Sequence, residues 1–306
     1  VTDGKMVYVT TMKVNERKIS APNVGAPRMI TPGSFMVAAF DMKGKKKWEQ
    51  NVGEFISAHG FNACPILYRN LVIINGDHDG DSYLAALNKQ TGQLQWKVPR
   101  ENKTRSYATP IIRTIGKREQ MILCGDKSVA SYDPANGKRH WIIDGPTEQF
   151  VASMVYNGKY AFVTGGYPER HILAIRPEGS GNITETHIAW RVKKGASYVP
   201  SPVVVGPYFV IAADNGIASC FKAEDGTRLW MERPGGGHSA SAITAGGLAY
   251  FVSDRGITSI IKPGPNFEVV AKNDLKELVS SSPAVSQGQI FIRGHKHLYS
   301  IGKGTN

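Results

Sequence analysis

The sequence lacks the features that would place it in several common classes of protein. It has no run of about 18 apolar residues, the minimum for a membrane-spanning helix, so we expect no transmembrane segment. No stretch shows the sustained periodicity of an amphipathic helix, and only residues 273–279 are predicted to form a single helical turn. These absences leave an all-β protein as the simplest expectation.

Cysteines are equally scarce. The sequence has three, Cys64, Cys124 and Cys220, and their spacing fits neither a CxxC metal site nor an even set of disulfides. We therefore expect each to be a free cysteine buried as a small apolar side chain.

Acidic residues are fewer than basic ones, so the chain carries an excess of positive charge. The sequence contains 37 Lys and Arg against 25 Asp and Glu, which gives a net charge of +12. This excess favours an anionic partner, although a basic surface also serves solubility. The basic residues form short scattered clusters without a stripe of interleaved aromatic residues, so we expect no nucleic acid and instead a protein or anionic glycan partner.

A repeat accounts for most of the chain. Each of the five tryptophans follows a polar turn that contains glycine, as in Asn88–Trp96, and successive tryptophans are 48, 45, 49 and 40 residues apart. Short strands repeated with such a period are typical of propeller blades. Seven apolar segments are predicted to be the second strands of seven repeat units: 7–11, 71–75, 121–125, 161–165, 209–213, 249–253 and 290–293.

The repeat predicts a β-propeller of four-stranded antiparallel blades that forms a single domain over residues 1–306. The first unit lacks most of its first strand, and the last lacks its fourth. We therefore expect an N-terminally trimmed chain whose parent supplies the missing strand. Residues 12–33, rich in Pro, Gly, Asn and Lys, are predicted to be a loop insertion in the first blade.

Two of these units resemble the PQQ-like (pyrroloquinoline-quinone-binding-like) β-propeller repeat. The resemblance rests on Tyr83–Asn88 with Thr91, Gly92 and Trp96, and on Ala130–Asp133 with Asn136–Lys138 and Trp141. Further stretches, such as Leu173–Pro177 and Asp214–Ala218, are similar to repeat proteins of planctomycete-type bacteria. That family also resembles the periplasmic lipoprotein that scaffolds outer-membrane protein assembly. The resemblance implies a parent of up to eight blades and a periplasmic or secreted location, with the export signal outside this chain.

Candidate site residues follow from aligning the repeats. The loops before the first strands and the turns between the second and third strands are expected at one face of a propeller, around its central channel. The first set provides the candidate catalytic residues His59, Arg105, Tyr198 and His238, together with Phe61 as a ligand-binding residue. The second set provides the other candidate ligand-binding residues: Asp126, Glu169, Arg170, Asp214, Asp254, Arg255, His295 and His297. The competing interpretation is that each Asp caps a turn of its own backbone and that each His is structural.

Cofactor binding is a separate question. Asp77, Asp79 and Asp81 alternate as in a calcium loop, but Ser82 and Asn88 stand where such a loop has Gly and an acid. Enzymes that use PQQ resemble this repeat, but they carry a vicinal cysteine pair, which this sequence lacks. PQQ and calcium are thus candidates without a recognisable set of ligands.

Two hypotheses of different classes follow. The first is a monomeric, non-catalytic scaffold that holds a protein or glycan on its loop face. The second is an enzyme, either a PQQ-dependent oxidoreductase or a carbohydrate-active propeller similar to a polysaccharide lyase. The sequence contains no recognisable catalytic set, which favours the scaffold over the enzyme.

Overall fold

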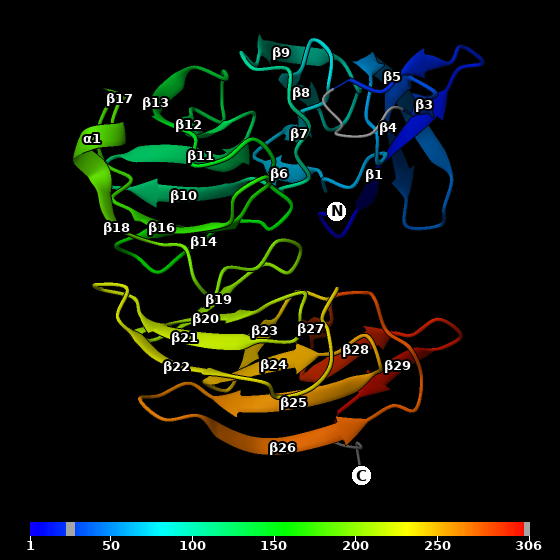
Figure 1. Ribbon diagram of the computed structural model, residues 1–306. Coiled ribbons are helices and arrows are strands. Elements are labelled where there is room, and N and C mark those ends of the chain that lie inside the picture. Colours follow the sequence, from blue (N-terminus) through cyan, green and yellow to red (C-terminus); the bar gives the residue numbers. More distant parts are fainter. Residues whose placement is uncertain (23–27, 303–306) are drawn as a thin grey trace. The chain divides into compact units, whose positions relative to one another are not determined.

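The computed structural model describes residues 1–22 and 28–302 (Figure 1). These residues form antiparallel sheets and one short helix, α1 (Thr184–His187), so the expected all-β class is confirmed. The predicted helical turn at 273–279 is wrong. Residues 273–274 end strand β26 (Glu268–Asp274), and the following residues form a loop held by side-chain hydrogen bonds.

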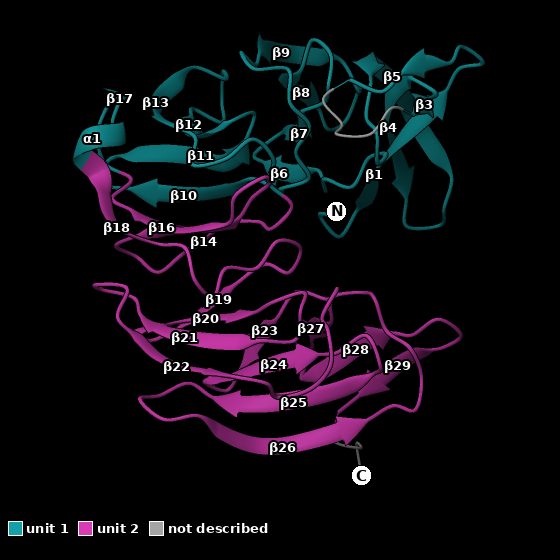
Figure 2. Cartoon of the chain, in the orientation of Figure 1, with its two compact units in different colours: residues 1–150, 178–186 teal, residues 151–177, 187–306 magenta. Residues whose placement is uncertain are grey.

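The chain divides into two compact units (Figure 2). Unit 1 comprises residues 1–150 and 178–186, and unit 2 comprises residues 151–177 and 187–306. The number of blades and the organisation of residues 1–306 as one domain stay predictions.

The described residues of unit 1 form three sheets of the repeat and one small two-stranded sheet. The first is β1 (Met6–Val14), β4 (Gly33–Asp41) and β5 (Lys46–Phe55). The second is β6 (Ile66–Tyr68), β7 (Leu71–Gly76), β8 (Tyr83–Asn88) and β9 (Leu94–Pro99). The third is β10 (Ile111–Ile115), β11 (Arg118–Gly125), β12 (Ser128–Tyr132) and β13 (Arg139–Asp144), extended by the short parallel strand β17 (Gly181–Asn182).

The predicted insertion at 12–33 contains more strand than expected. Strands β1 and β4 pair from Met6 with Asp41 to Val14 with Gly33, so both ends of the predicted loop belong to a long hairpin. Within the connection, the short strands β2 (Ile19–Ser20) and β3 (Met29–Ile30) pair with each other.

Unit 2 contains four sheets. The first two are β14 (Val155–Tyr156), β15 (Ala161–Gly165), β16 (His171–Ile175) and β18 (Ile188–Val192), followed by β19 (Val203–Val205), β20 (Tyr208–Ala212), β21 (Ala218–Lys222) and β22 (Arg228–Glu232). The last two are β23 (Ile243–Ala245), β24 (Leu248–Val252), β25 (Ile257–Lys262) and β26, followed by β27 (Ala284–Ser286), β28 (Gln289–Arg293) and β29 (Leu298–Ile301). The seven predicted second strands coincide with β1, β7, β11, β15, β20, β24 and β28, which confirms the alignment of the repeat.

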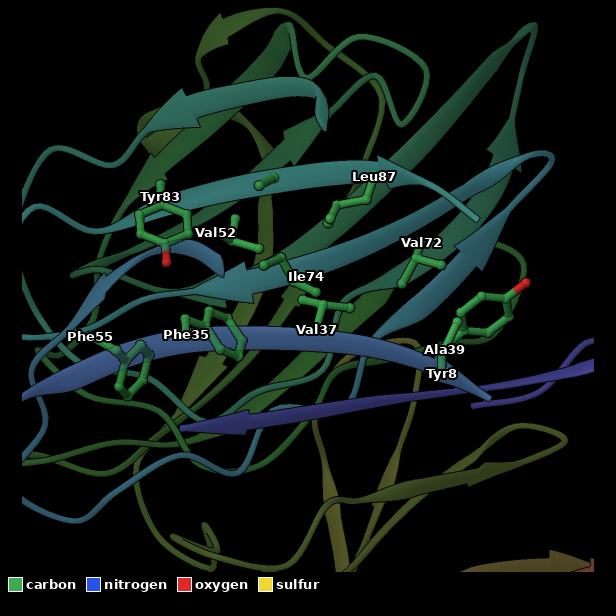
Figure 3. Close-up of a cluster of buried hydrophobic side chains, with 11 residues drawn as sticks. Tyr8, Phe35, Val37, Ala39, Val52, Phe55, Val72, Ile74, Tyr83 and Leu87 are labelled. Carbon is green, nitrogen blue, oxygen red and sulfur yellow. The ribbon is translucent and has the colours of Figure 1, made fainter. Parts of the chain in front are cut away.

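Each tryptophan lies on the last antiparallel strand of its sheet: β5, β9, β13, β18 or β22. The indole N–H of Trp48, Trp190 and Trp230 donates to a carbonyl of the next sheet in the chain, at 3.0, 3.0 and 3.1 Å. Within each unit, apolar side chains pack between consecutive sheets, as Figure 3 shows for Phe35 and Val37 of the first sheet beside Val72 and Ile74 of the second. The burial of these large side chains is the main source of stability between the sheets.

The sixth sheet departs from this pattern. In the fifth sheet, Trp230 on β22 pairs with Cys220 next to a β-bulge. At the equivalent position of the sixth sheet, also next to a β-bulge, Ala271 on β26 pairs with Ile260. A cavity of about 430 Å³ lies between this sheet and the last one, lined by residues that include Ile260, Ile290 and Ile292. Strand β26 thus has no indole to place beside the last sheet.

A repeated hydrogen bond joins the entrances of the sheets. The residue two positions before the first strand of a sheet donates its backbone N–H to a side-chain hydroxyl. That hydroxyl belongs to the residue two positions before the first strand of the next sheet. In unit 2 the donors Ser153, Ser201 and Ser241 pair with the hydroxyls of Ser201, Ser241 and Ser282, each at 2.9 Å, and in unit 1 Cys64 donates to Thr109 at 3.2 Å. These bonds fix where each entering loop ends and its sheet begins.

Candidate functional site

The entering loops and the turns between second and third strands meet at one end of each sheet. We call these segments the loop rims. The loop rim of unit 1 comprises residues 56–65, 77–82, 100–110 and 126–127. The loop rim of unit 2 comprises residues 166–170, 193–202, 213–217, 233–242, 253–256, 275–283 and 294–297. Their contacts show what the predicted site residues do.

Asp77 belongs to a buried ion pair in the rim of unit 1. Arg100 Nε donates to Asp77 Oδ1 at 2.8 Å, and the two side chains are 1% and 0% exposed. The same guanidinium donates to Tyr132 Oη at 2.6 Å and to the Gly125 carbonyl at 3.0 Å. Burial favours the neutral form of Arg100, but Asp77, Tyr132 and Asp126 together outweigh it and raise the pKa of Arg100, so the guanidinium stays charged.

Asp79 and Asp81 are held separately from Asp77. Asp79 accepts hydrogen bonds from Arg105 Nη1 at 2.8 and 2.9 Å, whereas Asp81 is exposed and pairs with Lys103 at 2.7 Å. Between them, His78 Nδ1 accepts the N–H groups of Ile56 and Gly80, and burial lowers its pKa to about 4. No group of three or more His, Cys, Asp or Glu side chains in the described ranges is arranged to bind a metal.

Two candidate catalytic residues of unit 1 lie in one polar cluster. His59 Nδ1 contacts Arg28 Nη2 at 3.2 Å, and Arg28 also donates to the Ala58 carbonyl. Burial, together with the charges of Arg28 and Arg105, lowers the pKa of His59. The neutral imidazole can therefore accept a hydrogen bond from Arg28, while Arg105 is engaged by Asp79.

Phe61 packs into the core. Its ring lies 4.5 Å from that of Phe35 and 5.5 Å from that of Phe55, measured between centroids. The structure thus places this predicted ligand-binding residue in an aromatic cluster between the first two sheets, where it is half-buried.

Asp126 ties the turn after β11 to the loop after β9. Its carboxylate accepts the N–H groups of Glu101 at 2.8 Å, Asn102 at 3.0 Å and Thr104 at 3.4 Å. Asp126 is 2% exposed and adopts a positive φ of 51°, a conformation that Asp tolerates better than most residues. The carboxylate caps a neighbouring loop of the rim.

Unit 2 brings together three of the predicted residues. Asp214 accepts the N–H of Tyr198 at 2.9 Å and a guanidinium N–H of Arg170 at 3.0 Å. The Arg170 guanidinium also lies 6.0 Å from the centroid of the Tyr198 ring. Beside them, Glu169 pairs with Lys193 at 2.6 Å. This cluster is half-exposed, so its charges are available to a partner.

Asp254 and His238 are structural in their contacts. Asp254 accepts the N–H of Ser239 at 2.7 Å. His238 is 2% exposed and packs against Phe251, and burial lowers its pKa. Arg255, the neighbour of Asp254, is exposed on the rim.

The last sheet uses a different carboxylate. His297 Nδ1 lies 2.7 Å from Glu277 Oε2, which also accepts the hydroxyl of Tyr299 at 2.6 Å. The Lys296 and His297 N–H groups donate to the other oxygen. These bonds, that from Tyr299 first, lower the pKa of Glu277 to about 2. His295 is exposed, and its N–H donates to the Leu278 carbonyl at 3.0 Å.

Several of these residues escaped the sequence interpretation. The sequence analysis did not identify Arg28, Arg100 and Glu277, because each lies far along the chain from the residues that it contacts. Only for Glu277 did the sequence hold a sign of a different carboxylate, since its repeat unit has His295 where four others have Asp. The expectation for the cysteines is wrong in one case, since Cys64 is exposed. Cys124 and Cys220 are buried, which raises the pKa of both thiols to about 12.

The sheets, their order and their rims define a PQQ-like β-propeller protein, as the repeat predicted. The family model described as outer membrane protein assembly factor BamB matches residues 3–155, and the chain belongs to this family.

Solved structures support the same fold. The crystal structure of BamB from Moraxella catarrhalis aligns with a TM-score of 0.65 and 10% identity, over 92% of this chain and 90% of that one. A europium-containing methanol dehydrogenase aligns with a TM-score of 0.59 and 13% identity, over 92% of this chain and 77% of that one. No curated protein matches the sequence. At these identities the structures show the fold alone.

Proposed function

We propose that this chain is a non-catalytic scaffold that holds another protein on its loop rims. The observation that carries the proposal is the use of the rim carboxylates. Asp77 and Asp79 bind buried arginines, and Asp126, Asp214 and Asp254 accept N–H groups of the adjoining loops. Groups used in this way build a rigid surface, and a preorganised surface loses little entropy when it binds a partner.

The family favours a protein over a glycan as the partner, because its model is described as an assembly factor for outer membrane proteins. The same description supports a periplasmic or secreted location. Among the helices of the described residues, none is long and apolar enough to cross a membrane. A monomer is the simplest form of such a scaffold.

The similarity to a methanol dehydrogenase keeps an oxidoreductase in view as the second candidate. The residues described here do not fit calcium-bound PQQ. The chain has no adjacent cysteines, and the two acids that begin the Asp77–Asp81 stretch already bind Arg100 and Arg105. We therefore derive no step through that cofactor.

The test places a photo-crosslinking residue at Arg255, on the loop rim of unit 2, and as a control at Arg228, an exposed arginine at the opposite end of the same unit. In an extract of the source organism we expect one protein adduct of defined mass from position 255 and none from position 228. The crosslinked protein, once purified, should bind the wild-type chain in calorimetry.

Other results would overturn parts of the proposal. Equal adducts from both positions would remove the special role of the rim. Binding of alginate or heparin at the rim, with no protein adduct, would make the partner a glycan. Turnover of a redox dye with PQQ and calcium, or of a polysaccharide, that is lost in His238→Gln would make the protein an enzyme.

A further inference from the structure

A hollow of about 530 Å³ opens at the rim of the last sheet. Ser280 and Ser281 come from the loop before β27, Arg293 ends β28, and Gly294 and His295 begin the next turn. The hollow therefore combines a guanidinium, an imidazole and two hydroxyls.

The repeat shows that the charge of this turn is reversed. In four other units the first or second residue of the turn is an aspartate: Asp77, Asp126, Asp214 or Asp254. The residue two positions earlier is Asn75, Cys124, Ala212 or Val252, all uncharged and buried. In the last unit these two positions hold His295 and Arg293, both exposed. The last unit thus presents an arginine and a histidine at positions where four other units have an uncharged residue and a carboxylate.

Internal contacts fix the hollow without neutralising Arg293. Ser281 Oγ donates to the Arg293 carbonyl at 2.7 Å, and the His295 N–H donates to the Leu278 carbonyl at 3.0 Å. The nearby acid, Glu277, is occupied by Tyr299, His297 and two backbone N–H groups. Arg293 has no ion-pair partner within residues 1–22 and 28–302.

We propose that this hollow binds a carboxylate of an acidic side chain on the partner protein, with Arg293 as the principal contact. The inference rests on the scaffold function proposed above and names the chemistry of its partner. A guanidinium offers two parallel N–H donors that match the two oxygens of a carboxylate. The Ser280 hydroxyl and the His295 ring can supply further donors, and the net charge of +12 accelerates the approach of an acidic segment.

The test measures binding of a fluorescein-labelled oligoglutamate peptide by fluorescence anisotropy. Arg293→Val introduces the residue type that the sixth unit has at this position, so the strand should tolerate it. Arg228→Val removes the same charge from an exposed strand position at the other end of unit 2. We expect Arg293→Val to weaken binding about tenfold and Arg228→Val less than about twofold, because a charge-assisted bond is lost only in the first.

Each alternative result has a defined meaning. Equal losses in the two variants, or no binding by the wild-type chain, would overturn the inference. Displacement of the peptide by low millimolar inorganic phosphate, but not by acetate, would overturn the carboxylate assignment in favour of a phosphate group. Because the peptide assay does not need the natural partner, it can fail while the crosslink from position 255 succeeds, and the two proposals are thereby separated. Unfolding midpoints of both variants close to that of the wild-type chain verify that the fold is intact.

Discussion

Aspartate–arginine pairs in the turn between second and third strands are buried in the rim of unit 1 and partly exposed in the rim of unit 2. In unit 1, Asp77 and Asp79 are paired with Arg100 and Arg105, and all four side chains are at most 3% exposed. In unit 2, Asp214 at the corresponding turn pairs with Arg170, and these side chains are 27% and 41% exposed.

This difference separates a structural use of charge from a use available for binding. A buried pair contributes rigidity, because removing one partner leaves an uncompensated charge. An exposed pair contributes little to stability, because water screens it. Its cation can, however, leave the carboxylate of its own chain and bind a carboxylate of a partner. We infer that the rim of unit 1 mainly supports the fold and that the rim of unit 2 meets the partner.

The largest expected effect comes from breaking the buried pair. Asp77→Ala should lower the free energy of unfolding by about 3–5 kcal/mol, because Arg100 stays buried without its carboxylate. Urea denaturation measures the change. Asp81→Ala is the matched control in the same turn, and it should change stability far less because Asp81 is exposed and its pair with Lys103 is screened by water.

Similar losses in these two variants would show that the Asp77–Arg100 pair is no more important than a surface contact. A double variant with Arg100→Met supplies a second check, since replacing both partners removes the isolated charge and should recover part of the stability.

A smaller effect is expected from the loop cap at Asp126. Asp126→Ala removes the acceptor of the Glu101, Asn102 and Thr104 N–H groups and should cost about 1–3 kcal/mol. Hydrogen exchange at these three amides should accelerate. The matched variant Asp254→Ala removes the acceptor of Ser239 and should cost less. A larger loss from Asp254→Ala would contradict the proposed ranking of the two caps.

Acid should weaken the last sheet in a defined range of pH. The pKa of Glu277 is lowered from 4.5 to about 2, so its contribution to stability is complete above pH 4.5 and is lost as the pH falls through 2. The difference in unfolding midpoint between the wild-type chain and Glu277→Gln should therefore shrink between pH 5 and pH 2. Thermal unfolding followed by circular dichroism measures it. A difference that grows on acidification would contradict the assignment.

The sequence was a good guide to the strands and a poor one to the contacts of the rim. The second strands and the tryptophan strands were predictable because alternating apolar residues and glycine turns are local signals. The partner of Asp77 was not predictable, since Arg100 lies 23 residues away and only the pairing of β7 with β8 and of β8 with β9 brings the two residues to the same end of their sheet. Phe61 illustrates the same limit, because an aromatic residue in a loop has the same sequence signal whether it faces a ligand or the core.

The smallest expected effect on stability comes from breaking the exposed pair between Arg170 and Asp214. Arg170→Ala should change the free energy of unfolding by less than about 1 kcal/mol, because the pair with Asp214 is partly exposed and screened. The same variant should weaken binding of the crosslinked partner, because it removes a cation from the rim of unit 2. Denaturation in urea measures the first quantity and calorimetry the second. A loss of stability as large as that of Asp77→Ala, with unchanged binding, would reverse the roles that we assign to the two rims.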